Sequence, residues 1–265
     1  MGENFTELDG LVIREVKVGE KDKLITLLTA EEGLITISGK GLTSIKNKYA
    51  ASAQLFTYST FQLKKRGEYY YIVDTFLIES FMNIRYDIEK LSLANYVCDV
   101  AHDLALVGIG DDELLSLVLN TLYATANMNI PLDIIKGAFE FRAAVSEGFM
   151  PDLSFCGMCG DEISGDSVLD VMNGRILCKK CRAELENTPE FIRDDTSAKI
   201  MIRLSPAVLS ALRYIESAPL KKFLSFTLDK TETSLFSVVC ERYLLNHLEH
   251  GFTSLEYYKK IRTTT

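Results

Sequence analysis

The sequence contains no long apolar run, and residues 1–10 lack the basic start and apolar stretch of an export signal. A membrane-spanning helix needs about 18 or more apolar residues in succession. There is also no internal repeat with a period of about 20 to 50 residues and no low-complexity tract. Because 47% of the residues are hydrophobic and 25% are charged, we expect a globular, cytoplasmic protein of more than one structural unit.

The common catalytic motifs are missing as well. No G-x-x-x-x-G-K-[ST] occurs, and Gly39-Lys40-Gly41 is only a turn with a lysine, so an intrinsic ATPase is not expected. The three histidines show no spacing to a carboxylate or serine that indicates a catalytic set. Asp111, Asp112 and Glu113 are typical of a helix start rather than of a metal site. We therefore expect no enzyme, and an unrecognised enzyme is the least favoured of the alternatives.

Acidic residues are missing from 33–67, although the whole chain has a net charge of −8. This segment has a local charge of +6, from Lys40, Lys46, Lys48, Lys64, Lys65 and Arg66. Aromatic residues, including Tyr49 and Tyr58, are interleaved with the cations. Cations beside aromatic rings are what a single-strand nucleic-acid groove requires. The alternative is a solvated strand face whose rings belong to the core.

Five β-branched or aromatic runs separated by glycines occupy residues 1–80: Leu8–Val18, Lys23–Thr29, Leu34–Gly39, Gln54–Lys64 and Tyr69–Phe81. Five strands without long intervening helices favour a small barrel, such as an OB-fold, with an SH3-like barrel as its rival. We expect an α+β protein in which an N-terminal OB-fold β-barrel, 1–80, precedes a mainly helical part.

From Ile84 onward the apolar spacing becomes helical. Pro131 and Gly148 bracket one helix, Ser205 and Pro206 open another, and a last helix is expected to end near Gly251. The predicted division is a helical region at 81–152, a cysteine insert at 153–185 and C-terminal helices at 186–265 that complete the helical domain. A linker is expected at 186–198.

Two C-x-x-C pairs, Cys156 with Cys159 and Cys178 with Cys181, are separated by eighteen residues. This spacing predicts a zinc ribbon with one structural zinc ion, because four thiolates close the coordination sphere whereas catalytic zinc keeps a position open. Iron, redox-active cysteines and a catalytic metal are the alternatives. The nucleobase deaminases place proline before their C-x-x-C, but here Phe155 and Leu177 stand there. The remaining cysteines, Cys98 and Cys240, read as buried inert thiols.

Several short motifs resemble the RecO family of recombinational DNA repair proteins. The motifs are Gly10-Leu11-Val12-Ile13-Arg14, Gly19-Glu20-Lys21-Asp22, Leu24-Ile25-Thr26, Thr29, Gly33 and Gly39-Lys40-Gly41 in the barrel, then Phe139-Glu140-Phe141-Arg142, Gly148, Pro151 and Leu153 before Cys156. The likeness covers residues 8 to about 185, and beyond it only the helical pattern agrees.

The resemblance implies a non-enzymatic, nucleoid-associated mediator that binds single- and double-stranded DNA and anneals complementary strands. With RecR it would help RecA displace single-stranded DNA-binding protein, whose acidic, apolar tail the family contacts through its helical part. Arg14 and Lys40 fall in matching motifs. The other proposed DNA contacts come from local charge and aromatic content: Lys46, Lys48, Lys64, Lys65, Arg66, Tyr49 and Tyr58. Leu42-Thr43-Ser44-Ile45 stands where the family usually has further arginines. The alternative function is a zinc-ribbon interaction or transcription-associated module.

Overall fold

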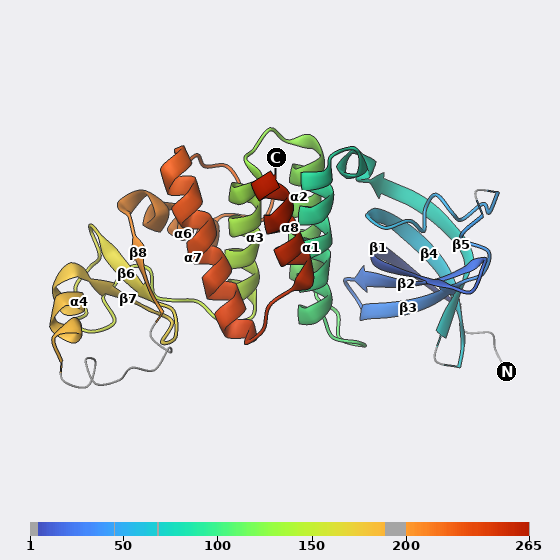
Figure 1. The fold of residues 1–265 in the computed structure, drawn as a ribbon. Helices are drawn as coiled ribbons and strands as arrows, with labels where there is room; N and C mark the ends of the chain where they lie inside the picture. The colour runs from blue at the N-terminus through green and yellow to red at the C-terminus, as the bar shows by residue number, and fades with distance from the viewer. Residues whose placement is uncertain (1–4, 45, 68, 189–199, 265) are drawn as a thin grey trace. The chain divides into compact units, whose positions relative to one another are not determined.

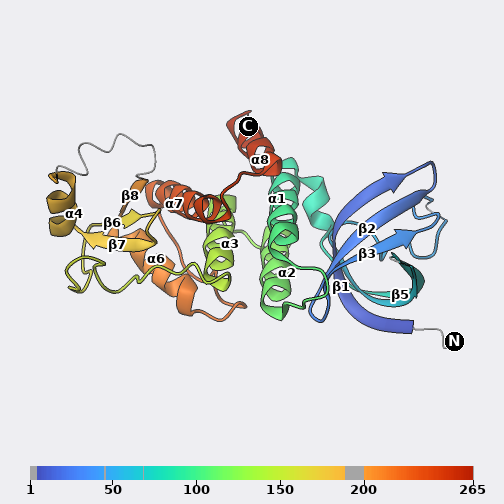
Figure 2. The ribbon, with the colours of Figure 1, turned by 90° about the horizontal axis from the view of Figure 1, so that it is seen from below.

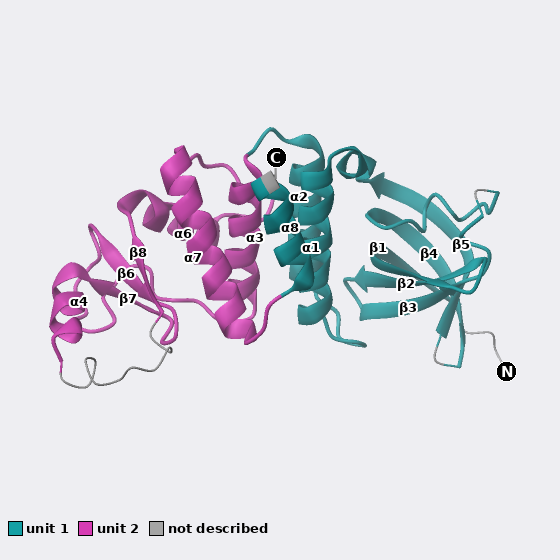
Figure 3. Cartoon of the chain, in the orientation of Figure 1, with its two compact units in different colours: residues 1–130, 252–265 teal, residues 131–251 magenta. Residues whose placement is uncertain are grey.

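A computed structural model describes residues 5–44, 46–67, 69–188 and 200–264. The chain forms two compact units, residues 1–130 with 252–265 and residues 131–251 (Figure 3). No helix among the described residues is both long and apolar enough to cross a membrane.

The first unit begins with five strands: β1 Phe5–Val18, β2 Asp22–Thr29, β3 Gly33–Gly39, β4 Thr57–Arg66 and β5 Tyr69–Ser80. They close into a barrel in the order β1-β2-β3-β5-β4 (Figure 1). The β3–β5 pairing is parallel and the other pairings are antiparallel. β3 and β4 alternate buried and more exposed residues, as period-two strands should. The expected OB-fold barrel is confirmed.

The interior of the barrel is apolar. Its residues come from every strand except β5 and from the β3–β4 connection, and they are Leu8, Val12, Ile25, Leu27, Ile35, Ile37, Leu42, Ala53, Phe61 and Leu63. Tyr49, Tyr70 and Ile72 pack against this cluster from the side. Outside this cluster, Leu11 and Leu28 are also fully buried, so only part of the outer face of the strands is exposed.

Three helices and a 3-10 turn complete the first unit: η1 Met82–Tyr86, α1 Ile88–Leu104, α2 Asp112–Asn127 and α8 Thr253–Thr264. α1 and α2 pack side by side (Figure 2). Asp111 caps α2 through a 2.8 Å bond to the Leu114 N–H, as its position in the sequence predicts. α8 packs on α1, where the Tyr96 and Phe252 rings meet edge to face at 5.7 Å.

The barrel is tied to these helices by a close backbone contact. Gly33 has a φ of +61°, and a Cβ there would lie 2.0 Å from the Leu106 carbonyl oxygen. The Leu34 N–H donates to that same oxygen at 3.1 Å, and the Gly108 N–H donates to Glu32 at 2.9 Å. Only glycine fits such an approach. The barrel and the α1–α2 connection therefore form one packed body.

The second unit contains a helical part and a small sheet. Its elements are α3 Leu132–Ser146, β6 Ser167–Asp170, β7 Arg175–Cys178, α4 Lys179–Glu186, β8 Met201–Leu204, α6 Pro206–Ser217 and α7 Lys230–Leu248. The sheet order is β7-β6-β8. Gly148, with a φ of +86°, follows α3, and Ser205 with Pro206 opens α6, so these predicted boundaries are confirmed.

The C-terminal helices differ from the expectation in one respect. α7 ends at Leu248, with Glu249 in the left-handed region at a φ of +59°, and a further helix, α8, follows. The prediction that the helix before Gly251 is the last one is therefore wrong. Most of the expected linker, residues 189–198, lies outside the described residues. The fourfold division predicted from the sequence is finer than the two compact units and remains a prediction.

Candidate metal centre and nucleic-acid interface

The four predicted cysteines come together in the second unit. Their sulfur atoms all lie within 4.8 Å of one another, and the Cys159 and Cys178 sulfurs are 3.9 Å apart. The first pair lies in the turn before β6, and the second pair joins β7 to α4. The predicted four-cysteine cluster is therefore confirmed, and it is a set of ligands that can hold a metal ion.

Backbone N–H groups donate to two of the four sulfurs. The Cys178 N–H donates to the Cys156 sulfur at 3.3 Å, and the Cys181 N–H donates to the Cys178 sulfur at 3.4 Å. Burial opposes ionisation of Cys156, but donors from Cys159, Cys178 and Met158 outweigh it and lower the pKa of this thiol to about 6.

Tetrahedral zinc fits this donor set. Zinc–sulfur bonds of ~2.3 Å in a tetrahedron place neighbouring sulfurs ~3.8 Å apart, close to the 3.9 Å between Cys159 and Cys178. Four thiolates leave no position for water, which is the arrangement of structural sites. Cys98 and Cys240 are buried outside the cluster, as expected of inert thiols.

The nucleobase deaminases also carry a His-x-Glu tripeptide, and one such tripeptide occurs in this chain, at His247-Leu248-Glu249. The His247 ring stacks on Phe149 at 4.4 Å and meets Tyr243 edge to face at 4.4 Å. It is not one of the residues that make up the cysteine cluster. In the described structure this histidine is therefore an aromatic packing residue.

The barrel gathers most of the predicted cations around tyrosine rings. The Lys65 nitrogen lies 5.3 Å from the centre of the Tyr70 ring, and the Lys48 nitrogen lies 4.5 Å from that of Tyr49. Lys64 lies 5.5 Å from the Phe5 ring. These distances are those of cation–π pairs.

Tyr71 is the ring that two predicted cations share. Lys40 and Arg66 each lie 5.9 Å from its centre. Tyr71 also lines a hollow of about 240 Å³ together with Lys40 and Tyr49. Neither Tyr70 nor Tyr71 was predicted as a site residue. The signal was present, because Tyr69-Tyr70-Tyr71 follows the Lys64-Lys65-Arg66 run after a tight turn at Gly67.

The other predicted contacts are not gathered at Tyr71. Arg14 is exposed in β1 opposite Thr26, and Lys46 is exposed in the β3–β4 connection. Lys48 also faces Asp74, with 3.8 Å between the charged atoms. Tyr58 is half-buried, and its burial is the main cause of a raised pKa. The charges of Asp9, Glu31 and Asp112 raise this pKa further. Its surroundings are thus acidic, unlike those of Tyr71. The DNA contacts as a set remain predictions.

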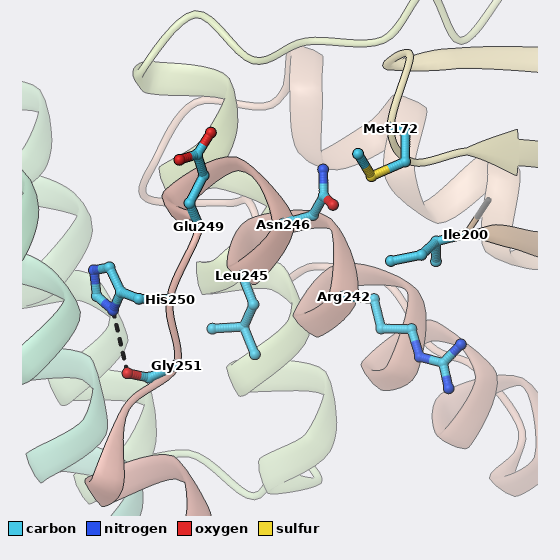
Figure 4. A pocket seen from close by; sticks show the side chains of 8 residues that line it. All are labelled: Met172, Ile200, Arg242, Leu245, Asn246, Glu249, His250 and Gly251. Carbon is cyan, nitrogen blue, oxygen red and sulfur yellow. Dashed lines mark hydrogen bonds between the residues drawn. The ribbon is translucent and has the colours of Figure 1, made fainter. Parts of the chain in front are cut away.

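A second hollow, of about 630 Å³, lies in the second unit beside the C-terminal end of α7. Leu245, Met172 and Ile200 supply apolar lining, while Arg242 supplies a positive charge and Glu249 a negative one (Figure 4). An open, largely apolar hollow of this kind can take an apolar chain end.

The structure defines an OB-fold protein with a helical part and a cluster of four cysteines that can hold a metal ion. Family models agree: "Recombination protein O N terminal" matches residues 1–81, and "Recombination protein O C terminal" matches residues 85–256. The chain belongs to the RecO family of DNA repair proteins.

Similar proteins span almost the whole chain. The DNA repair protein RecO of Acetivibrio thermocellus is 31% identical over 259 residues, which are 97% of this chain and 98% of that protein. The protein of the same name from Alkaliphilus metalliredigens is 29% identical over 258 residues, 96% of this chain and 98% of that protein. The resemblance read from short motifs is therefore confirmed, and it extends beyond residue 185.

Proposed function

We propose that this protein is a non-enzymatic recombination mediator that binds single- and double-stranded DNA and anneals complementary strands. With RecR it would help load RecA onto DNA covered by single-stranded DNA-binding protein. The observation that carries this proposal is the set of cations placed over tyrosine rings on one closed barrel, above all Lys40 and Arg66 at Tyr71.

This surface has the two components that single-strand binding needs. Lysine and arginine side chains neutralise phosphates without reading sequence, and rings offer stacking platforms for any base. Strand annealing requires contact of this kind, because a protein that holds phosphates leaves the pairing edges of the bases free. The positions that lack the family's arginines serve the fold instead. Leu42 belongs to the barrel core, and Thr43 donates to the Lys21 carbonyl at 2.9 Å.

Because residues 42–45 carry no arginine, the protein would rely on RecR for part of its affinity for DNA. Phosphate contacts supply most of the sequence-independent affinity, and each contact contributes more at low salt because it acts through the release of counterions. If RecR supplies further phosphate contacts, it should increase the apparent affinity for single strands more at 50 mM salt than at 200 mM. A RecR effect that did not depend on salt would argue against this division.

We also propose that the α7 hollow receives the acidic, apolar C-terminal tail of single-stranded DNA-binding protein. Its apolar lining would hold the tail's apolar end, and Arg242 would pair with the tail's carboxylates. A tail peptide should bind the full-length protein, and Arg242→Glu should abolish that binding. Arg203→Glu, at an exposed cation outside this hollow, is the matched control. Equal binding by both variants would remove this assignment.

We further propose zinc as the ion held by Cys156, Cys159, Cys178 and Cys181. The fit of four thiols at near-tetrahedral spacing supports it. When bound, the metal would supply structural stability, while the chain's own N–H donors hold the sulfurs in place. One zinc atom per chain is expected by elemental analysis, and iron in its place would give a coloured protein.

The central test uses the full chain, because the barrel shares its backbone contact with the α1–α2 connection. This chain should accelerate the annealing of complementary strands that are coated with single-stranded DNA-binding protein. The double variant Lys40→Gln with Arg66→Gln should lose that acceleration. Zinc-loaded protein that neither binds nor anneals DNA would contradict the mediator role. It would favour the alternative of a zinc-ribbon interaction module.

A further inference from the structure

Asn47 lies in the connection between β3 and β4, between two cations of the barrel surface, Lys40 and Lys48. Both polar ends of its side-chain amide are bound within the fold. The Nδ2–H donates to the Lys40 carbonyl oxygen at 3.0 Å, and Oδ1 accepts from the Tyr49 N–H at 2.9 Å. This one side chain therefore joins the backbone at Lys40 to the backbone at Tyr49.

Each of the two joined segments carries one cation–tyrosine pair. Lys40 lies 5.9 Å from the centre of the Tyr71 ring, and Lys48 lies 4.5 Å from that of Tyr49. The Tyr49 hydroxyl is held too, because it donates to a backbone carbonyl of β5. Asn47 lines the hollow of about 240 Å³ that Lys40, Tyr49 and Tyr71 also line. An uncharged residue thus stands at the junction of the two pairs.

The turn at Lys40 is held from a second side. The Gly41 N–H donates to Oδ1 of Asp22 at 2.8 Å. The Lys40 carbonyl and the Gly41 N–H belong to one planar peptide group, so Asn47 and Asp22 bind its two polar atoms. The Lys40 side chain is exposed. Its place beside the Tyr71 ring therefore depends on how this peptide group is turned.

A backbone turn that is already ordered avoids the loss of affinity that comes with ordering it during binding. We propose that Asn47 is a positioning residue, which presents Lys40 to a phosphate of a single strand while the neighbouring base stacks on Tyr71. Asp22 supports the same peptide group from its other side. This inference rests on the proposed DNA-binding function, and it adds to the barrel surface a residue without charge or ring that acts through Lys40.

A neutral substitution distinguishes positioning from a purely structural role. Asn47→Ala removes no charge, yet it should flatten the log–log salt slope for a long single strand by ~0.7, as expected when the Lys40 phosphate contact is lost. The loss of affinity should be about 2.5-fold larger at 50 mM than at 200 mM salt. Asn120→Ala is the matched control, because the Asn120 Nδ2–H also donates to a backbone carbonyl, at 2.7 Å, but within α2 of the same unit. It should leave the slope unchanged.

A double-variant cycle tests whether Asn47 acts through Lys40. Once Lys40→Gln is present, Asn47→Ala should have little further effect on the slope or the affinity. Two additive effects would show that Asn47 affects binding by another route, and would remove the positioning role. Asn47→Ser identifies the end of the amide that matters. A serine hydroxyl can accept from the N–H two residues later but lacks the amide nitrogen, so this variant should flatten the slope as Asn47→Ala does.

Amide hydrogen exchange of the free full chain tests the contacts without DNA. In Asn47→Ala, the Tyr49 N–H should exchange faster because it loses its acceptor, and the Gly41 N–H should exchange faster because its peptide group loses one of two bonds. Asn47→Ser should restore protection at Tyr49 alone. Unchanged exchange at Gly41 in both variants would show that Asn47 does not hold the Lys40 turn.

The outcomes separate this inference from the proposed function. If the unchanged chain binds single strands and Asn47→Ala matches Asn120→Ala in slope, the positioning role is overturned while the proposed function stands. If exchange at Gly41 changes as expected but the unchanged chain binds no DNA, Asn47 only shapes the fold. The inference and the proposed function then fail together.

Discussion

The Lys40 ammonium lies 5.9 Å from the centre of the Tyr71 ring, at the point where β3 and β5 run parallel. Ser38 pairs with Tyr71 in this short stretch, so the ring is fixed by the closure of the barrel itself. A base that stacks on Tyr71 would have the Lys40 ammonium beside it. Stacking and charge can therefore be separated by substitution.

Tyr71→Ala should weaken binding of single strands by about 1 to 3 kcal/mol, the usual contribution of one stacked base. The salt slope should hardly change, because no charge is removed. Tyr71→Phe should retain most of the affinity. Tyr123→Ala removes a tyrosine of the same unit that is 50% exposed, and it serves as the control. Equal affinities of the two alanine variants would remove Tyr71 from the interface.

Removing cations from the barrel surface should change how steeply the affinity for single strands falls with salt. If Lys40, Lys46, Lys48, Lys64, Lys65 and Arg66 all meet phosphates, log affinity should fall with log salt at a slope of about −4. Lys40→Gln with Arg66→Gln should flatten it by about 1.4 units and weaken all sequences alike. Lys17→Gln with Lys21→Gln makes the same charge change on exposed positions of the β1–β2 hairpin. If both pairs had the same effect, general charge and not this surface would govern binding.

The strands and the cysteine cluster could be predicted because their signals are local. Alternation fixes which side of β3 is buried, and each C-x-x-C turn brings its own two sulfurs together. The surroundings of Tyr58 could not be predicted. Its neighbours Asp9 and Asp112 are far from it in the sequence and come near only in the folded unit, whereas the sequence already places Arg66 close to Tyr71.

The return of the chain end to the first unit was also hidden from local patterns. Phe252, Leu255 and Tyr258 recur at a helix-like spacing and are buried. That spacing could have predicted α8, but nothing in it shows that the partner helix is α1, about 150 residues earlier. Long-range pairing of this kind depends on the complementary face, which a single sequence does not reveal.

Gly33→Ala should destabilise the first unit far more than Gly19→Ala. Both glycines have a positive φ, +61° and +63°, so both substitutions carry the backbone cost of about 1 kcal/mol. Only at Gly33 would the new methyl meet a carbonyl oxygen, at 2.0 Å. The cost there should exceed ~3 kcal/mol, measured by urea denaturation. Similar losses would mean that the contact between the barrel and residues 105–110 adjusts readily.

Loss of zinc should unfold the cysteine module before the barrel. Closed thiolate sites contribute apparent energies of ~10 to 16 kcal/mol in small zinc modules. Cys178→Ser should abolish zinc binding and expose the β6–β7–β8 sheet to proteolysis, and Cys156→Ser should impair folding more than DNA binding by the barrel. Cys240→Ser, at a buried thiol outside the cluster, should keep one zinc per chain. A Cys178→Ser protein that retained a full zinc content would show that the ion binds elsewhere.

The second unit should lose stability in mild acid partly through His247. Burial lowers the pKa of this ring below its ordinary value of 6.5. Below pH 6.5 the unfolded chain therefore binds a proton that the folded chain resists, so stability falls as the pH falls and the contribution is fully present above pH 6.5.

His247→Phe keeps a ring between Phe149 and Tyr243 and removes a buried nitrogen that has no partner among the described residues. The variant should gain stability relative to the unchanged chain between pH 7.5 and pH 5.5, measured as the difference in urea midpoints at each pH. Taking that difference cancels any acid-driven loss of zinc common to both proteins. His250→Gln, at an exposed histidine, is the control. A difference between His247→Phe and the unchanged chain that stays constant with pH would show that His247 titrates alike in the folded and unfolded states.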